Sequence, residues 1–218
     1  MEKYKMPRKF NNTNIFLCTI FIFFVFQGCT SGGKRSYEIQ NYLLDYSAPT
    51  LEKLTKLDST IRFNRFTIAV AYNTQNMIFR TDNYSLDFFS YNRWAVNPAD
   101  MVADILLRDM QASGLFHAAL SRYSVEETNF LLEGGIGEFF LRVEQNRKLA
   151  VICLEITLKD SRRRETNKRI IFQKKYCHEE LLAEQTPRGY CQAMSQALKT
   201  ISPQIITDAY QAIKSSAN

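Results

Sequence analysis

The chain has 218 residues, 45% of them hydrophobic, and a formal net charge of +6. Four of its 28 basic and one of its 22 acidic residues fall in residues 1–28. The 190 residues that follow therefore hold 24 basic and 21 acidic groups, a net charge of +3, which is no evidence for a nucleic-acid partner. A chain of this length predicts one compact domain with a sizeable core.

The N-terminal segment is typical of an export signal. A basic leader (residues 3–9) precedes the apolar run Ile15–Phe26, which stops at Gln27-Gly28-Cys29. A membrane-spanning helix needs about 20 apolar residues, so this run is short for that role. The ending resembles the lipobox of bacterial lipoproteins, although that pattern prefers Leu at the position of Phe26 and a small residue at that of Gln27.

The lipobox resemblance implies cleavage after residue 28 and attachment of lipid to Cys29. A diacylglycerol would sit on its sulfur and an acyl chain such as palmitate on its nitrogen, and no other cofactor is expected. The alternative is an uncleaved signal anchor. We expect a signal peptide over residues 1–28, a lipidated polar tether over residues 29–36 and a folded domain over residues 37–218.

The first half of the domain predicts strands followed by one well-delimited helix. Aromatic and branched residues indicate strands at 37–46 and 61–72 and a hairpin formed by 77–80 and 84–91. Asn97 is a suitable helix cap, Pro98 a suitable first residue and Gly114 a suitable stop. The buried stripe of this helix is expected to comprise Val102, Ile105, Leu106 and Met110.

The second half predicts long strands and a closing helix. Strands are expected at 115–123, 130–143, 149–159 and 168–177, with the last two forming a hairpin. Gly134, Gly135 and Gly137 predict a bulge or a close backbone approach. A helix begins near Pro187, and Pro203 should kink or restart it with Ser202 as a cap. We therefore predict an α/β fold, a single domain in which helices pack on a mixed β-sheet.

Three cysteines remain in the predicted domain. In an oxidising compartment two of them could form a disulfide, and Cys177 with Cys191 are the favoured pair because they flank the last loop. The alternative is that Cys153, Cys177 and Cys191 are all reduced core residues.

The sequence offers little for catalysis. It has no GxxxxGK[ST] phosphate loop and no Gly-x-Ser-x-Gly, and neither His117 nor His178 stands in a metal-binding or triad pattern. We expect no metal site and no enzyme.

Two surface features allow a functional interpretation. Arg162, Arg163 and Arg164 could meet anionic headgroups, but a solvated hairpin tip is favoured. An aromatic cluster could form a docking patch or lipid groove, although alternating aromatic residues on strands are more often core. Its members are Phe79, Tyr84, Phe88, Phe89, Tyr91 and Trp94.

An ordered set of motifs resembles the ABC-type transport auxiliary lipoprotein family. These motifs are Phe79-Arg80, Tyr91-x-Arg93-Trp94, Pro98 at the helix start, Ser113-Gly114-Leu115-Phe116 at its end and, upstream, Tyr42-Leu43-Leu44-Asp45 and the strand from Arg62 to Tyr72. The resemblance covers most of the domain and weakens after about Val143.

The resemblance implies a non-catalytic lipoprotein that works with an MCE-domain protein, an ABC permease and an ATPase to move phospholipids or other hydrophobic molecules. Threonine after Cys29 resembles outer-membrane sorting, with the domain facing the periplasm. Arg80, Tyr91, Arg93 and Trp94 would shape a partner-binding face, with a fold role favoured for Trp94. The alternative is an envelope structural or assembly lipoprotein with no transporter partner.

Overall fold

The computed structural model describes residues 37–51 and 54–216. The chain divides into a unit that ends at Tyr37 and a second unit, Glu38–Asn218, which forms the folded domain. The signal, the tether and Cys29 lie outside the described residues. Within the described ranges, no helix is long and apolar enough to cross a bilayer.

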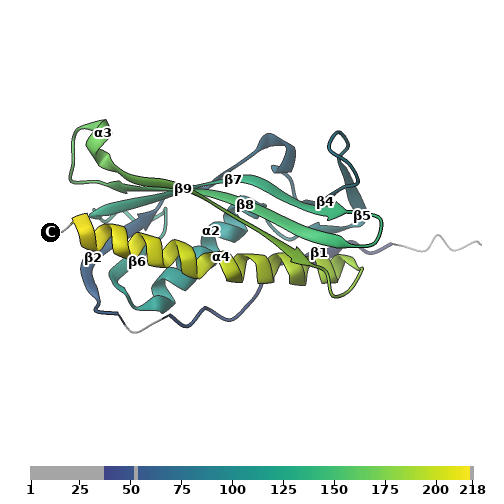
Figure 1. Ribbon diagram of the computed structural model, residues 1–218, viewed down its shortest axis with the longest axis horizontal. Helices are drawn as coiled ribbons and strands as arrows, with labels where there is room; N and C mark the ends of the chain where they lie inside the picture. The colour runs from purple at the N-terminus through teal and green to yellow at the C-terminus, as the bar shows by residue number, and fades with distance from the viewer. Residues whose placement is uncertain (1–36, 52–53, 217–218) are drawn as a thin grey trace, which may run out of the picture. The chain divides into compact units, whose positions relative to one another are not determined.

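The second unit is a mixed β-sheet with two long helices on one face (Figure 1). Its strands are β1 (Gln40–Tyr42), β2 (Leu57–Phe63), β3 (Thr67–Ile68), β4 (Asn76–Arg80), β5 (Asp87–Trp94), β6 (Phe116–Leu120), β7 (Phe130–Val143), β8 (Lys148–Asp160) and β9 (Ile170–Leu181). Its helices are η2 (Val70–Tyr72), α2 (Pro98–Ser113), α3 (Thr166–Arg169) and α4 (Pro187–Ser216). The predicted α/β class, with helices packed on one mixed sheet, is confirmed.

The long strand β7 organises the sheet. Its successive parts pair in parallel with β2, β3 and β4, and β5 and β1 continue the sheet beyond β4. On its other side β7 pairs antiparallel with β8, and β8 with β9. The sheet register shifts between Ile136 and Glu138, so the predicted bulge at the glycines is confirmed. Gly134 is needed because a Cβ there would lie 2.3 Å from the Phe66 ring.

The core lies between the sheet and the two long helices. Trp94 is 1% exposed and makes edge contacts with Phe139 of β7 and Tyr190 of α4, with ring centroids 5.4 Å apart in both pairs. Aromatic side chains of this size contribute strongly to the stability of a core. Helix α2 begins and ends as predicted, since the Asn97 side chain accepts a hydrogen bond from the amide of Ala99 and Gly114 has φ 65°.

Several predicted boundaries are wrong. The strand expected over 37–46 pairs only at Gln40–Tyr42, and the one expected over 61–72 is divided into the end of β2, β3 and η2. Strand β9 extends to Leu181, four residues beyond the predicted end. Helix α4 continues through Pro203, and Ser202 does not cap a new helix but donates a hydrogen bond to Asp109.

The predicted disulfide between Cys177 and Cys191 is also wrong. Cys177 is bonded to Cys153, which lies directly opposite it in the β8–β9 register. Cys191 is a free, buried thiol on α4. Adjacent antiparallel strands bring Cα atoms within about 4.5 to 5.5 Å, which is inside the range for a disulfide. The strand register therefore decided the pairing, and proximity along the last loop did not.

Candidate docking site

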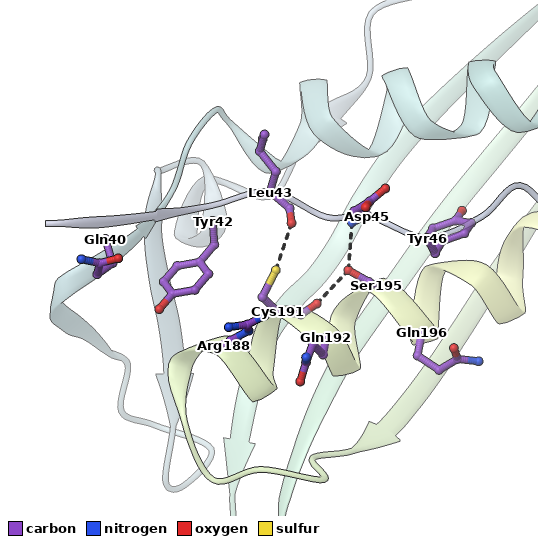
Figure 2. A pocket seen from close by; sticks show the side chains of 10 residues that line it. All are labelled: Gln40, Tyr42, Leu43, Asp45, Tyr46, Arg188, Cys191, Gln192, Ser195 and Gln196. Atoms are coloured by element: carbon purple, nitrogen blue, oxygen red, sulfur yellow. Dashed lines mark hydrogen bonds between the residues drawn. The ribbon is translucent and has the colours of Figure 1, made fainter.

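A groove runs between β1, the four residues after it and the first half of α4 (Figure 2). It has a volume of about 600 Å³. It is lined by Gln40, Tyr42, Leu43, Asp45, Tyr46, Arg188, Cys191, Gln192, Ser195 and Gln196. Most of these side chains are polar, so the groove suits a polar chain or headgroup more than a hydrocarbon tail.

Hydrogen bonds from α4 hold the extended segment that forms one wall of the groove. The Cys191 thiol donates to the carbonyl oxygen of Leu43 at 3.0 Å, and the Ser195 hydroxyl accepts from the amide of Asp45 at 3.1 Å. Ser195 also donates to the carbonyl oxygen of Cys191 at 2.8 Å. Figure 2 shows the Leu43 side chain pointing away from α4 while its carbonyl faces the helix. These contacts replace the sheet partners that the segment lacks after Tyr42.

Among its lining residues the groove has one thiol, Cys191, and no histidine. Burial raises the pKa of the Cys191 thiol to about 11, so the thiol is protonated at neutral pH and is a hydrogen-bond donor, not a nucleophile. His117 and His178 lie elsewhere, beside Asp58 and Glu180 respectively. Among the described residues, no group of three or more His, Cys, Asp or Glu is placed to hold a metal ion.

A buried carboxylate beside the groove joins α2, the segment after β1 and α4. Asp109 of α2 is fully buried and accepts hydrogen bonds from the hydroxyls of Tyr46 at 2.7 Å and Ser202 at 2.6 Å. It also accepts two from the Arg108 guanidinium, which lies over the Tyr46 ring. The sequence interpretation missed this network. The available signal was that Asp109 falls at helical spacing from Ile105 and Leu106, on the apolar stripe of α2.

Two of the four predicted partner-binding residues have structural roles. Trp94 is buried in the core, as favoured from the sequence. The Arg80 guanidinium lies 5.0 Å from the centre of the Phe140 ring and donates to the Tyr72 hydroxyl and the carbonyl of Asn83. Arg80 therefore fastens the β4–β5 turn to the sheet, and its substitution would disturb the fold.

The other two, Tyr91 and Arg93, remain candidates for partner contact. Arg93 and Trp94 point to opposite faces of β5, so Arg93 lies on the face away from the core. Tyr91 is 46% exposed. The aromatic cluster itself is divided: Phe79 and Phe89 pack on each other at 5.2 Å and on the core, whereas Tyr84 is fully exposed and Phe88 is 49% exposed.

The arginine loop is less available than its sequence indicates. The buried carboxylate of Asp160 accepts hydrogen bonds from both Arg162 and Arg163, and the bond from Arg162 is the main cause of its lowered pKa. Arg162 also lies over the Phe130 ring. Two of the three arginines are thus held by one carboxylate within the fold. The loop and α3 stand at the end of the sheet opposite β1 (Figure 1).

The architecture is that of a class of α/β proteins with one mixed sheet and helices on one face. A protein from Xanthomonas campestris has this fold, with a TM-score of 0.73, 14% identity and coverage of 82% of this chain and 99% of that one. An uncharacterised protein gives a TM-score of 0.63 at 10% identity, with coverage of 79% and 99%. A hypothetical protein from Chlamydia trachomatis gives 0.50 at 8% identity, with coverage of 72% and 98%.

The family model for the ABC-type transport auxiliary lipoprotein component matches residues 42–206. The chain belongs to this family, and the resemblance seen in the sequence is confirmed. A search of curated proteins found no match. The chain is thus an auxiliary lipoprotein of an ABC-type transport system, which associates it with a membrane of the cell envelope.

Proposed function

We propose that the protein is the non-catalytic, membrane-anchored component of an MCE-type ABC transport system that moves phospholipids or other hydrophobic molecules across the envelope. Its partners would be an MCE-domain protein, a permease and an ATPase. The observation that carries the proposal is the family match over residues 42–206, which includes α2, β5 and nine of the ten residues that line the groove. The polar lining of the groove supports a role in contact rather than in enclosing a lipid tail.

Anchoring belongs to the same proposal. Cys29 would be acylated after cleavage of residues 1–28, and Thr30 in the following position favours the outer membrane over the inner one. Growth with a clickable fatty acid, followed by membrane fractionation, tests both points. The wild type should be labelled in the outer-membrane fraction and Cys29→Ala should be unlabelled. An unlabelled wild type would contradict lipidation of Cys29. Label in the inner-membrane fraction would contradict sorting of the protein to the outer membrane.

The outer face of β5 is a second proposed partner surface, in addition to the groove. A photo-crosslinking amino acid at Arg93 should capture a component of the transporter in native membranes, because Arg93 has no ion-pair partner among the described residues. Tyr123 provides a matched control, since it is 76% exposed on the loop between β6 and β7. Equal capture from both positions would refute this surface as a docking site.

The transport role is tested by crosslinked affinity purification of the C-terminally tagged protein with mass spectrometry. Recovery of an MCE-domain protein with its permease and ATPase is the expected result. Recovery of envelope assembly proteins alone would favour the structural lipoprotein instead. A deletion strain should also show altered phospholipid distribution between the membranes, which a structural factor without a transporter would not produce.

A further inference from the structure

Strand β9 forms one edge of the sheet. It pairs with β8 alone, and its other edge carries backbone groups that no described strand satisfies. The strand is 12 residues long and is not interrupted by proline or glycine. Long free edges of this kind are ready to pair with another strand, and natural proteins protect them with charge.

The register shows which backbone groups face outward. The amide of Leu182 donates to the carbonyl of Lys148 at 3.0 Å, so residue 182 is hydrogen-bonded to β8. Hydrogen-bonded and non-bonded positions alternate along an antiparallel ladder, and β9 runs without a register shift from Phe172 to Leu181. The even-numbered residues therefore bond to β8, whereas the odd ones, among them Cys177, present their N–H and C=O groups to the free edge. The Cα separation of 4.1 Å between Cys153 and Cys177 agrees with a non-bonded pair.

The charges on this edge are self-complementary about Cys177. Lys174 and Lys175 lie three and two residues before it, and Glu179 and Glu180 two and three residues after it. In an antiparallel pairing of two β9 strands centred on Cys177, Lys175 faces Glu179 of the other copy on the outer face. Lys174 faces Glu180 on the helix side, the side on which Lys174 contacts Asp208 of α4.

We propose that β9 pairs with β9 of a second copy of this chain, antiparallel and centred on Cys177. The odd-numbered residues from Gln173 to Leu181 would then exchange on the order of ten backbone hydrogen bonds. The arrangement is isologous, and each of the two charge pairs occurs twice. The proposal does not depend on the transported substrate or on the transporter partner.

Neighbouring registers fit less well. A pairing centred on Lys175 would place the two Lys175 side chains directly opposite each other, and like charges in that position are destabilising. A pairing centred on Tyr176 would place Lys174 opposite His178 and leave the glutamates without lysine partners. The side chains that pair in the favoured register are accessible, because Lys175 is exposed and Glu179, which also contacts Arg142, is 48% exposed in its side chain.

The symmetry is compatible with two lipid anchors in one membrane. Continuing a sheet through two antiparallel edges requires a two-fold axis perpendicular to the sheet, which keeps both α4 helices on the same side. With that axis along the membrane normal, the two copies of β1 lie at the same height. Anchoring in one plane would also raise the effective concentration of the two edges.

Disulfide trapping in native membranes tests the register. The Gln173→Cys/Leu181→Cys protein should form a covalent dimer on mild oxidation, because residues 173 and 181 of different copies are opposed, whereas within one chain they are about 26 Å apart. Lys175→Cys should not form a dimer, since its partner position holds Glu179. Lys56→Cys, at an exposed site before β2, measures random collision. A dimer yield no higher than that of Lys56→Cys would overturn the proposal.

Charge exchange tests the interface without relying on one variant. In the Gln173→Cys/Leu181→Cys background, Lys175→Glu should lower the dimer yield by about fivefold or more, because it creates two like-charge pairs. Adding Glu179→Lys should restore the yield to within about twofold, while Lys56→Glu should leave it unchanged. An equal yield in all backgrounds, or trapping of a different protein in place of a second copy, would refute the pairing.

Discussion

The buried carboxylate of Asp109 should be one of the most sensitive positions for stability. Replacing it with alanine leaves the hydroxyls of Tyr46 and Ser202 without their acceptor. Each buried donor left without a partner costs about 1 to 3 kcal/mol. Because two such donors are involved, Asp109→Ala should lower the free energy of unfolding by about 4 kcal/mol.

Removing only one donor should be much milder. Ser202→Ala leaves Asp109 with its bonds from Tyr46 and Arg108, so the expected loss is about 1.5 to 2 kcal/mol, at the low end of the range for a bond to a charged group. In the Asp109→Ala/Ser202→Ala protein, one orphaned hydroxyl is gone. The double variant should therefore be at least about 1 kcal/mol more stable than the sum of the single effects predicts.

Urea unfolding of the purified chain, followed by circular dichroism, measures these differences. Asp109→Ala should shift the midpoint by more than about 1 M with an unchanged slope. Gln111→Ala on the same helix is a suitable control, because its side chain gives a single hydrogen bond to the carbonyl of Ala119 at a partly buried site. A loss below about 1 kcal/mol for Asp109→Ala, or strict additivity in the double variant, would refute the account of the network.

Three further predictions concern the core, the disulfide and pH. Tyr190→Phe should leave stability unchanged or raise it by up to about 1 kcal/mol, since the buried hydroxyl has no hydrogen-bond partner among the described residues; a measured loss in urea would show that it is bonded. Cys153→Ala/Cys177→Ala should lower stability by about 2 to 4 kcal/mol, and the wild type should lose as much on reduction while the variant does not respond. Burial is the largest cause of the raised pKa values of the Tyr46 and Tyr176 hydroxyls. The unfolded chain therefore loses these protons at a lower pH than the folded chain, and the free energy of unfolding should fall as pH rises above about 10. Tyr46→Phe/Tyr176→Phe should flatten that decline in unfolding curves recorded at about pH 8 to 11.

The parts of the fold that were predictable are those fixed by local signals. Asn97, Pro98 and Gly114 each satisfy a requirement of a helix end, so α2 begins and ends where expected. Apolar residues alternate along β8, so this strand and its hairpin with β9 were predicted. A repeat of two residues identifies a strand whichever strand it pairs with.

The parts that were not predictable depend on contacts distant in sequence. The segment after Tyr42 has strand-like composition, but it bonds to Cys191 and Ser195, almost 150 residues away, and so leaves the sheet. The disulfide followed a strand register that spacing along the chain does not reveal. Of the candidate partner residues, the burial of Trp94 was anticipated, whereas the attachment of Arg80 to Phe140 required the fold.

The fastening of the segment after β1 has a mechanical consequence. A pull applied to the chain before β1 is met first by three residues of β1, a short edge strand that alone would give little resistance. The next four residues are tied to α4 at Cys191 and Ser195 and to α2 through Tyr46 and Asp109. Tension is therefore shared between the two longest helices within the described fold, and these contacts oppose unravelling of the domain from the edge of the sheet.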